Sequence, residues 1–197
     1  MALINRVRNI IVNPKEEWKL ISAESSPGPS LIFSYLFPLA LAASIATFIG
    51  FSFLTFGFSV GTGFALVTAI IMLVQLLVTV YVNAFVTDAL APSFSSEKNL
   101  GKSIQLVVYA ATPAYVGAIL NIIPAIGSLG TLAGSIYSIY LFYLGIPILK
   151  KTPPEKAVGY LIAIIVVMII VFWIIRSILW RLVFPTYYIG YQGIGNF

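Results

Sequence analysis

The chain has no cysteine and no histidine among its 197 residues. Their absence excludes disulfide bonds, thiolate or imidazole metal ligands, and catalysis by a cysteine or histidine side chain. Charge is also scarce: Asp, Glu, Lys and Arg make up 9% of the residues, whereas soluble domains carry about 25%. The sequence also has no phosphate-binding loop, carboxylate pair or nucleophile–base motif. We therefore expect no catalytic, metal-binding or cofactor-binding residues, and no enzyme.

Apolar residues dominate what remains, at 60% of the chain with a mean hydropathy of +1.03. So few charges cannot cover a soluble core, so the sequence predicts an integral membrane protein. No charged residue lies between Glu24 and Asp88, a run too long for one crossing at about 20 residues. We expect an all-α polytopic bundle of five transmembrane helices, near residues 31–56, 64–87, 103–123, 128–149 and 157–182.

The N-terminal segment predicts a pair of amphipathic helices. Apolar residues recur at helical spacing from Leu3 to Ile11, and Pro14 separates them from a second short helix that holds Trp18. We interpret the pair as lying on the membrane surface, with Trp18 at headgroup depth. We expect no signal peptide. The whole chain, 1–197, then forms a single membrane domain with a cytoplasmic segment and linker (1–30), the bundle (31–182) and an extracytoplasmic tail (183–197).

Lysine and arginine predict the orientation. Nine of the eleven lie in the N-terminal segment, the 88–102 loop and the 150–156 turn, and the two opposite loops hold none. The positive-inside rule then predicts a multi-pass protein of the plasma (inner) membrane with a cytoplasmic N-terminus and an extracytoplasmic C-terminus. Arg176 and Arg181, near the outer end of the fifth span, are the exceptions. We interpret the net charge of +5 as topology and expect no nucleic-acid partner.

Two local patterns concern structure. Small residues four apart predict close helix contacts in the first, third and fourth spans: Ala42, Ala46 and Gly50; Ala110, Ala114 and Ala118; Gly130, Gly134 and Ser138. The turn between the last two spans carries the second pattern. We expect Pro147 to bend its helix and Gly145 to admit a neighbouring backbone. Thr152 and Glu155 have the spacing of a capping box that starts the next helix.

A polar stripe marks the second span. Gln75, Thr79, Asn83 and Thr87 are spaced four apart, so they share one helical face. An amide facing lipid would be costly, so this seam must face the bundle. The third span offers a partner stripe in Gln105, Tyr109 and Thr112. We expect Asn83 and Thr87 to lie level with Gln105 and Tyr109, on the cytoplasmic half. Two interpretations stay open: hydrogen bonds that hold the helices together, which we favour, and a hydrated conduit that includes Asp88.

Other polar residues also allow two interpretations. Asp88 could relay protons or bind a cation, but a solvated residue at a helix end is the interpretation we favour. Tyr137, Tyr140 and Tyr143 could form a hydroxyl track, although such tyrosines more often pack. Basic residues of the 150–156 turn could bind lipid headgroups or serve only topology and helix capping: Lys150, Lys151 and Lys156.

Several segments together resemble the Yip1 domain family, in its prokaryotic branch of small inner-membrane proteins. They cover nearly the whole chain: Asn13-Pro14 with Trp18, Pro38-Leu39-Ala40, residues 90–94 with Asn99, Tyr109 with Thr112-Pro113, Ile123-Pro124, residues 140–147, and residues 151–153 with 155–157. The resemblance implies five spans with a cytoplasmic N-terminus. Eukaryotic relatives act in vesicle traffic, bind prenylated GTPases and associate with one another, whereas the prokaryotic branch has no settled biochemical function.

These observations lead to two hypotheses about function. The first is a non-enzymatic membrane protein that organises membrane or recruits partners, because catalytic residues are missing and the predicted cytoplasmic face is basic and amphipathic. The alternative is a transporter or channel for a small solute, ion or lipid. The expected partners are membrane lipids, a second copy of the chain, or another membrane or cytoplasmic protein.

Overall fold

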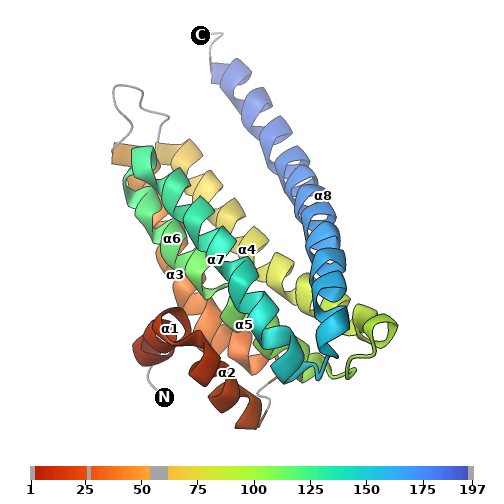
Figure 1. The fold of residues 1–197 in the computed structure, drawn as a ribbon. Helices are drawn as coiled ribbons and strands as arrows, with labels where there is room; N and C mark the ends of the chain where they lie inside the picture. The colour runs from red at the N-terminus through yellow and green to blue at the C-terminus, as the bar shows by residue number, and fades with distance from the viewer. Residues whose placement is uncertain (1–2, 26–27, 54–61, 195–197) are drawn as a thin grey trace.

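A computed structural model describes residues 3–25, 28–53 and 62–194. Within these ranges the chain is helical and contains no strand. Five of the described segments are long and apolar enough to cross a membrane: Ile32–Ser52, Thr62–Phe94, Leu100–Ile122, Ala125–Leu149 and Pro154–Arg181. They form a bundle from which the last of them leans away (Figure 1). The predicted all-α bundle of five spans is confirmed, although residues 54–56 of the first predicted span lie outside the described ranges.

Proline shapes the first and third spans. A π-helical turn, Ile32–Leu36, precedes α3 (Phe37–Phe53). Pro38 has no N–H to donate to the preceding turn, so the chain there is wound more loosely. The third span is two helices, α5 (Leu100–Ala110) and α6 (Thr112–Ile119), separated at Ala111 just before Pro113. A short 3₁₀ turn, Leu120–Ile122, follows. This interrupted third span is the most enclosed of the five.

Glycines allow the long helix of the fourth span to pack closely against the third span. α7 (Pro124–Leu149) lies against α6. A Cβ on Gly130 would stand 2.9 Å from the Gly117 carbonyl oxygen, and one on Gly134 2.2 Å from that of Pro113. Ser138 accepts a hydrogen bond from the Ala114 N–H. The predicted stripe of small residues in the fourth span therefore faces the third span, as expected.

The second and fifth spans are the two remaining long helices, and they pack against each other. α4 (Thr62–Leu90) is extended by a 3₁₀ turn, Ala91–Phe94. α8 (Pro154–Ile194) packs against α4 and α7 through its first turns and then leans away from the other spans (Figure 1). Its helix continues past residue 182, where the sequence predicted the span to end.

The N-terminal helices α1 (Leu3–Val12) and α2 (Pro14–Ala23) lie at the end of the bundle where α7 gives way to α8 (Figure 1). Their placement corrects one part of the prediction for Trp18, whose side chain is fully buried within the protein and is not exposed on the membrane surface. Its depth relative to the headgroups stays a prediction. A Cβ on Gly145 would stand only 2.9 Å from the Trp18 ring. Gly145 therefore makes room for this indole and not for a neighbouring backbone.

The predicted capping box between α7 and α8 is also corrected. α8 begins at Pro154, and the Thr152 hydroxyl bonds the Ser96 hydroxyl at 2.8 Å and the Ile146 carbonyl at 3.5 Å. Thr152 thus ties the end of α7 to the chain after α4 and does not cap α8. Glu155 lies in the first turn of α8, where the helix dipole favours a negative charge. α7 continues through Pro147 for two residues, and the bend there stays a prediction.

Candidate functional site

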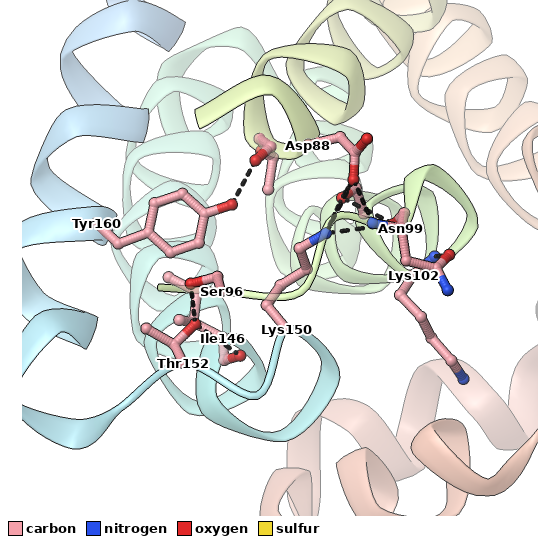
Figure 2. A network of polar contacts seen from close by, with 10 residues as sticks. Asp88, Ser96, Asn99, Lys102, Ile146, Lys150, Thr152 and Tyr160 are labelled. Carbon is pink, nitrogen blue, oxygen red and sulfur yellow. Dashed lines mark hydrogen bonds and ion pairs between the residues drawn. The ribbon is translucent and has the colours of Figure 1, made fainter. Parts of the chain in front are cut away.

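We call the end of the bundle that carries α1, α2, residues 91–99 and residues 150–153 the basic end. At its centre lies an ion pair between Asp88, in the last turn of α4, and Lys150, directly after α7 (Figure 2). The Lys150 ammonium stands 3.0 Å from Asp88 Oδ1, and the Lys150 side chain is wholly buried. The two residues are 62 positions apart, so only the folded bundle brings them together.

Every donor of this ammonium is used. Lys150 Nζ also donates to Ser103 Oγ at 2.7 Å and to the Asn99 carbonyl at 3.3 Å, which together with Asp88 engages its three N–H groups. Asp88 Oδ1 accepts two further bonds, from the Asn99 N–H at 2.7 Å and from Ser103 Oγ at 3.1 Å. Asn99 is the N-cap of α5. The pair therefore joins three spans at one point.

This arrangement overturns two predictions. Asp88 is buried and not solvated, and Lys150 is too deeply enclosed to bind a lipid headgroup. Burial lowers the pKa of Lys150 from its usual value, while the hydrogen bond and charge of Asp88 partly oppose that shift. A buried charge pair of this kind is costly to break, because either partner alone would be left as an uncompensated buried charge.

Lys151, the next residue, points to the outside. It has a left-handed backbone, with φ of 49°, which is uncommon for a residue with a side chain. Its ammonium pairs with Glu97 at 2.8 Å, and its side chain is 76% exposed. The hydrogen bond and charge of Lys151 lower the pKa of Glu97. Lys156 is also exposed and donates to Ser95 Oγ at 2.7 Å.

Tyr160 fixes the first turns of α8 beside the ion pair. Its side chain is fully buried, its hydroxyl donates to the Thr87 carbonyl (Figure 2), and its ring stacks on Phe94 with centroids 5.0 Å apart. This hydrogen bond thus links the start of α8 to α4, at the residue directly before Asp88. Beyond Ile164, no described side chain of α8 is buried.

A second charged cluster holds the N-terminal helices in place. Arg6 of α1 is buried and bonds the carboxylates of Glu17 and Glu24. Its guanidinium also lies over the Tyr109 ring, 5.4 Å from the centroid. Tyr109 packs edge-on against Tyr35, whose hydroxyl lies 3.0 Å from Thr112 Oγ1. Two predicted site residues, Tyr109 and Thr112, therefore belong to the group of contacts that holds α1 against the bundle.

The predicted polar seam faces inward. Gln75, Asn83, Thr87 and Gln105 are buried, and Thr79 is half-buried. Contacts between Asp88 and Ser103 and between Tyr115 and Leu76 set the antiparallel register. That register brings Asn83 level with Val108 and Tyr109, and Thr87 level with Ile104 and Gln105. Several buried seam atoms have no hydrogen-bond partner within the described protein: Gln75 Nε2, Thr79 Oγ1, Asn83 Oδ1, Thr87 Oγ1 and both amide atoms of Gln105.

The three tyrosines of α7 differ in their surroundings. The Tyr137 hydroxyl donates to the Ile11 carbonyl at 2.7 Å and so helps to hold α1. Tyr140 and Tyr143 are 43% and 42% exposed. Tyr143 lines a groove of about 430 Å³ between α2, α7 and the start of α8. The other lining residues are Lys15, Glu16, Lys19, Leu144, Pro147, Ile148, Pro154 and Ala157.

Comparison with family models decides the identity of this bundle. The Yip1 domain model matches residues 8–175, which include α2 to α7 and the first half of α8. The chain belongs to the Yip1 domain family. Comparison with curated proteins and with solved structures gives no match. Within the part of this Yip1 domain that the structure describes, no group of three or more acidic side chains could hold a metal ion.

Sequence reasoning missed the partners of the buried charges in this Yip1 domain. It interpreted Asp88 as a solvated residue and Lys150 as a headgroup ligand or a residue that serves topology and helix capping, and it made no prediction for Arg6. One signal was available: the second and fourth spans run in the same direction, so Asp88 and Lys150 come to the same end of the bundle. An acid and a base at the ends of two parallel spans are candidates for a pair.

Proposed function

We propose that this Yip1-domain protein organises the membrane or recruits partners through its basic end, and that it is not an enzyme. The observation that supports this best is the use of its charged side chains. Asp88, Lys150, Arg6 and Glu17 are buried in contacts that fix helices to one another. These charged groups hold the helices of the basic end together, and we call the outer surface of that end the platform. The groove between α2, α7 and α8 opens on the platform.

The orientation is part of the proposal. Five spans put the two termini on opposite sides of the membrane, and the basic residues favour an N-terminus in the cytoplasm. The groove would then lie at the inner leaflet of the plasma (inner) membrane. Alkaline phosphatase fused after Phe197 should be active, and the same reporter fused after Glu24 should be inactive. The reverse pattern would contradict the orientation.

A transporter or channel is the second candidate, because of the seam. Polar atoms without a partner are costly in the hydrocarbon region, and a file of water along α4 and α5 would satisfy them. Under this alternative, Asn83→Cys reacts with a water-soluble thiol reagent in a chain that has no other cysteine. Under the platform proposal, the cysteine stays protected.

Reconstitution separates the two functions. The full chain is inserted into vesicles of phosphatidylcholine and phosphatidylglycerol that carry a fluorescent anionic lipid. A membrane organiser changes lipid clustering, measured as self-quenching, or the vesicle diameter, and leaves the permeability to small solutes and ions at that of empty vesicles. A rise in permeability that thiol modification of Asn83→Cys blocks, without any change in clustering or diameter, would contradict the proposal.

A further inference from the structure

We propose that the groove between α2, α7 and α8 binds one anionic phospholipid, with the phosphate at Lys15 and Lys19 and an acyl chain along α7. This inference rests on the proposed function, because it names the ligand of the groove on the platform. It also replaces the predicted headgroup ligand Lys150, which is buried in the ion pair with Asp88.

The rim of the groove has the charge that such a headgroup requires. Lys15 and Lys19 are exposed residues of α2 that line it. Among the described residues, Lys15 has no ion-pair partner. Lys19 bonds the third charged lining residue, Glu16, at 2.9 Å, and both of those side chains are more than 60% exposed. An exposed pair of this kind contributes little, so a phosphate can compete for Lys19. Two lysines and one glutamate leave one positive charge, which matches a headgroup with one net negative charge.

The floor of the groove is apolar. We use this name for the apolar lining residues Leu144, Pro147, Ile148 and Ala157, none of which can bond a polar headgroup through its side chain. The groove lies where α7 ends at Leu149 and α8 begins at Pro154, which is the depth at which apolar spans meet the headgroup layer. Its composition therefore changes from basic to apolar in the direction in which a phospholipid changes.

An exposed stripe on α7 continues from the floor into the membrane. Tyr143, Tyr140 and Ile136 lie on one face of the helix with Pro147, at helical spacing. Their side chains are 42%, 43% and 61% exposed. Tyrosine rings favour the interface, and the isoleucine beyond them suits an acyl chain. A soluble peptide would leave this stripe uncovered, whereas a phospholipid covers rim, floor and stripe together.

The test measures lipid retention by the full chain purified in detergent. Native mass spectrometry follows titration with phosphatidylglycerol, phosphatidylcholine or phosphatidylethanolamine. The wild-type chain should bind one phosphatidylglycerol in preference to the others. Lys15→Gln/Lys19→Gln should weaken that binding roughly 30-fold, since each lysine near an anionic lipid contributes about fivefold. The control Arg8→Gln/Lys98→Gln removes the same charge from exposed positions outside the groove and should leave the affinity within about twofold of wild type.

Three results would overturn the inference: equal binding of the three lipids, equal losses in both double variants, or retention of phosphatidylglycerol by Lys15→Gln/Lys19→Gln. The vesicle assay separates this failure from failure of the proposed function. Lipid clustering without specific phosphatidylglycerol binding rejects the groove ligand alone. Specific binding without any effect on clustering or vesicle diameter rejects the membrane-organising function and leaves the ligand in place.

Discussion

Lys150 and Lys151 are neighbours in sequence and lie on opposite sides of one turn. Each pairs with a carboxylate at about the same distance, 3.0 Å to Asp88 and 2.8 Å to Glu97. The Lys150 side chain is completely enclosed, whereas that of Lys151 is 76% exposed. Distance alone therefore says little about what an ion pair does. Enclosure decides whether its loss strands a buried charge or only frees a surface side chain.

The largest expected effect is on the enclosed side. Asp88→Ala leaves Lys150 buried without its counter-charge and should lower the free energy of unfolding by about 3–5 kcal/mol. The melting temperature in detergent measures this loss. The matched control Glu97→Ala removes the partner of the exposed Lys151 and should lower the free energy of unfolding far less. Similar losses in the two variants would break the comparison.

The contrast between enclosed and open positions should also hold for glycines between helices. Gly134→Ala places a Cβ 2.2 Å from the Pro113 carbonyl oxygen, whereas Gly159→Ala meets only the Phe94 ring at 3.5 Å. Backbone atoms cannot rotate aside, so Gly134→Ala should force α6 and α7 apart at a cost of about 1–3 kcal/mol. Gly159→Ala should be neutral or slightly stabilising. Thermal unfolding of the two variants side by side checks this, and an unaffected Gly134→Ala chain would contradict the observed approach of the helices.

A smaller effect of opposite sign is expected in the seam. Gln105 is fully enclosed, and neither amide atom has a partner within the described protein. If the seam is dry, Gln105→Met removes an unsatisfied group and should stabilise the chain by about 1 kcal/mol. A hydrated seam predicts the reverse, because the amide would then bond water. Chemical denaturation measures the sign, and a clear loss of stability would favour the conduit.

The smallest effect belongs to the exposed pair. Lys151 lowers the pKa of Glu97 from its usual 4.5, so the folded state holds this carboxylate ionised more readily than the unfolded chain does. Its contribution is therefore present above about pH 4.5 and is lost as the pH falls through the folded pKa. Glu97→Gln should match wild type in melting temperature below that window and differ only slightly above it. A large difference at neutral pH would show that exposure does not weaken this pair.

Much of the fold could be predicted from the sequence, because lipid imposes strong local rules. Hydropathy and the missing charges between Glu24 and Asp88 predict the spans. The spacing of Gly130, Gly134 and Ser138 identifies a contact face, and the seam residues turn inward for the reason that their polarity implies. Each of these inferences concerns one helix and the medium around it.

The rest depends on contacts between distant segments. Trp18 is enclosed because Gly145, more than a hundred residues later, leaves space for its ring. Lys150 is enclosed because α4 and α5 supply Asp88, Asn99 and Ser103. When only the sequence is known, a charge near the end of a span is assigned to solvent, since its partner is not known. The interruption at Ala111 could have been predicted from Pro113, whose ring disfavours helix in the preceding turn.

Amine labelling tests the central contrast most directly. The full chain in detergent is treated with a water-soluble amine-reactive reagent, and fragment-ion spectra of the peptide around the turn separate Lys150 from Lys151. We predict that Lys151 reacts at the rate of other exposed lysines such as Lys98, while Lys150 is protected until the chain unfolds. Comparable labelling of Lys150 and Lys151 in the folded chain would contradict the buried ion pair.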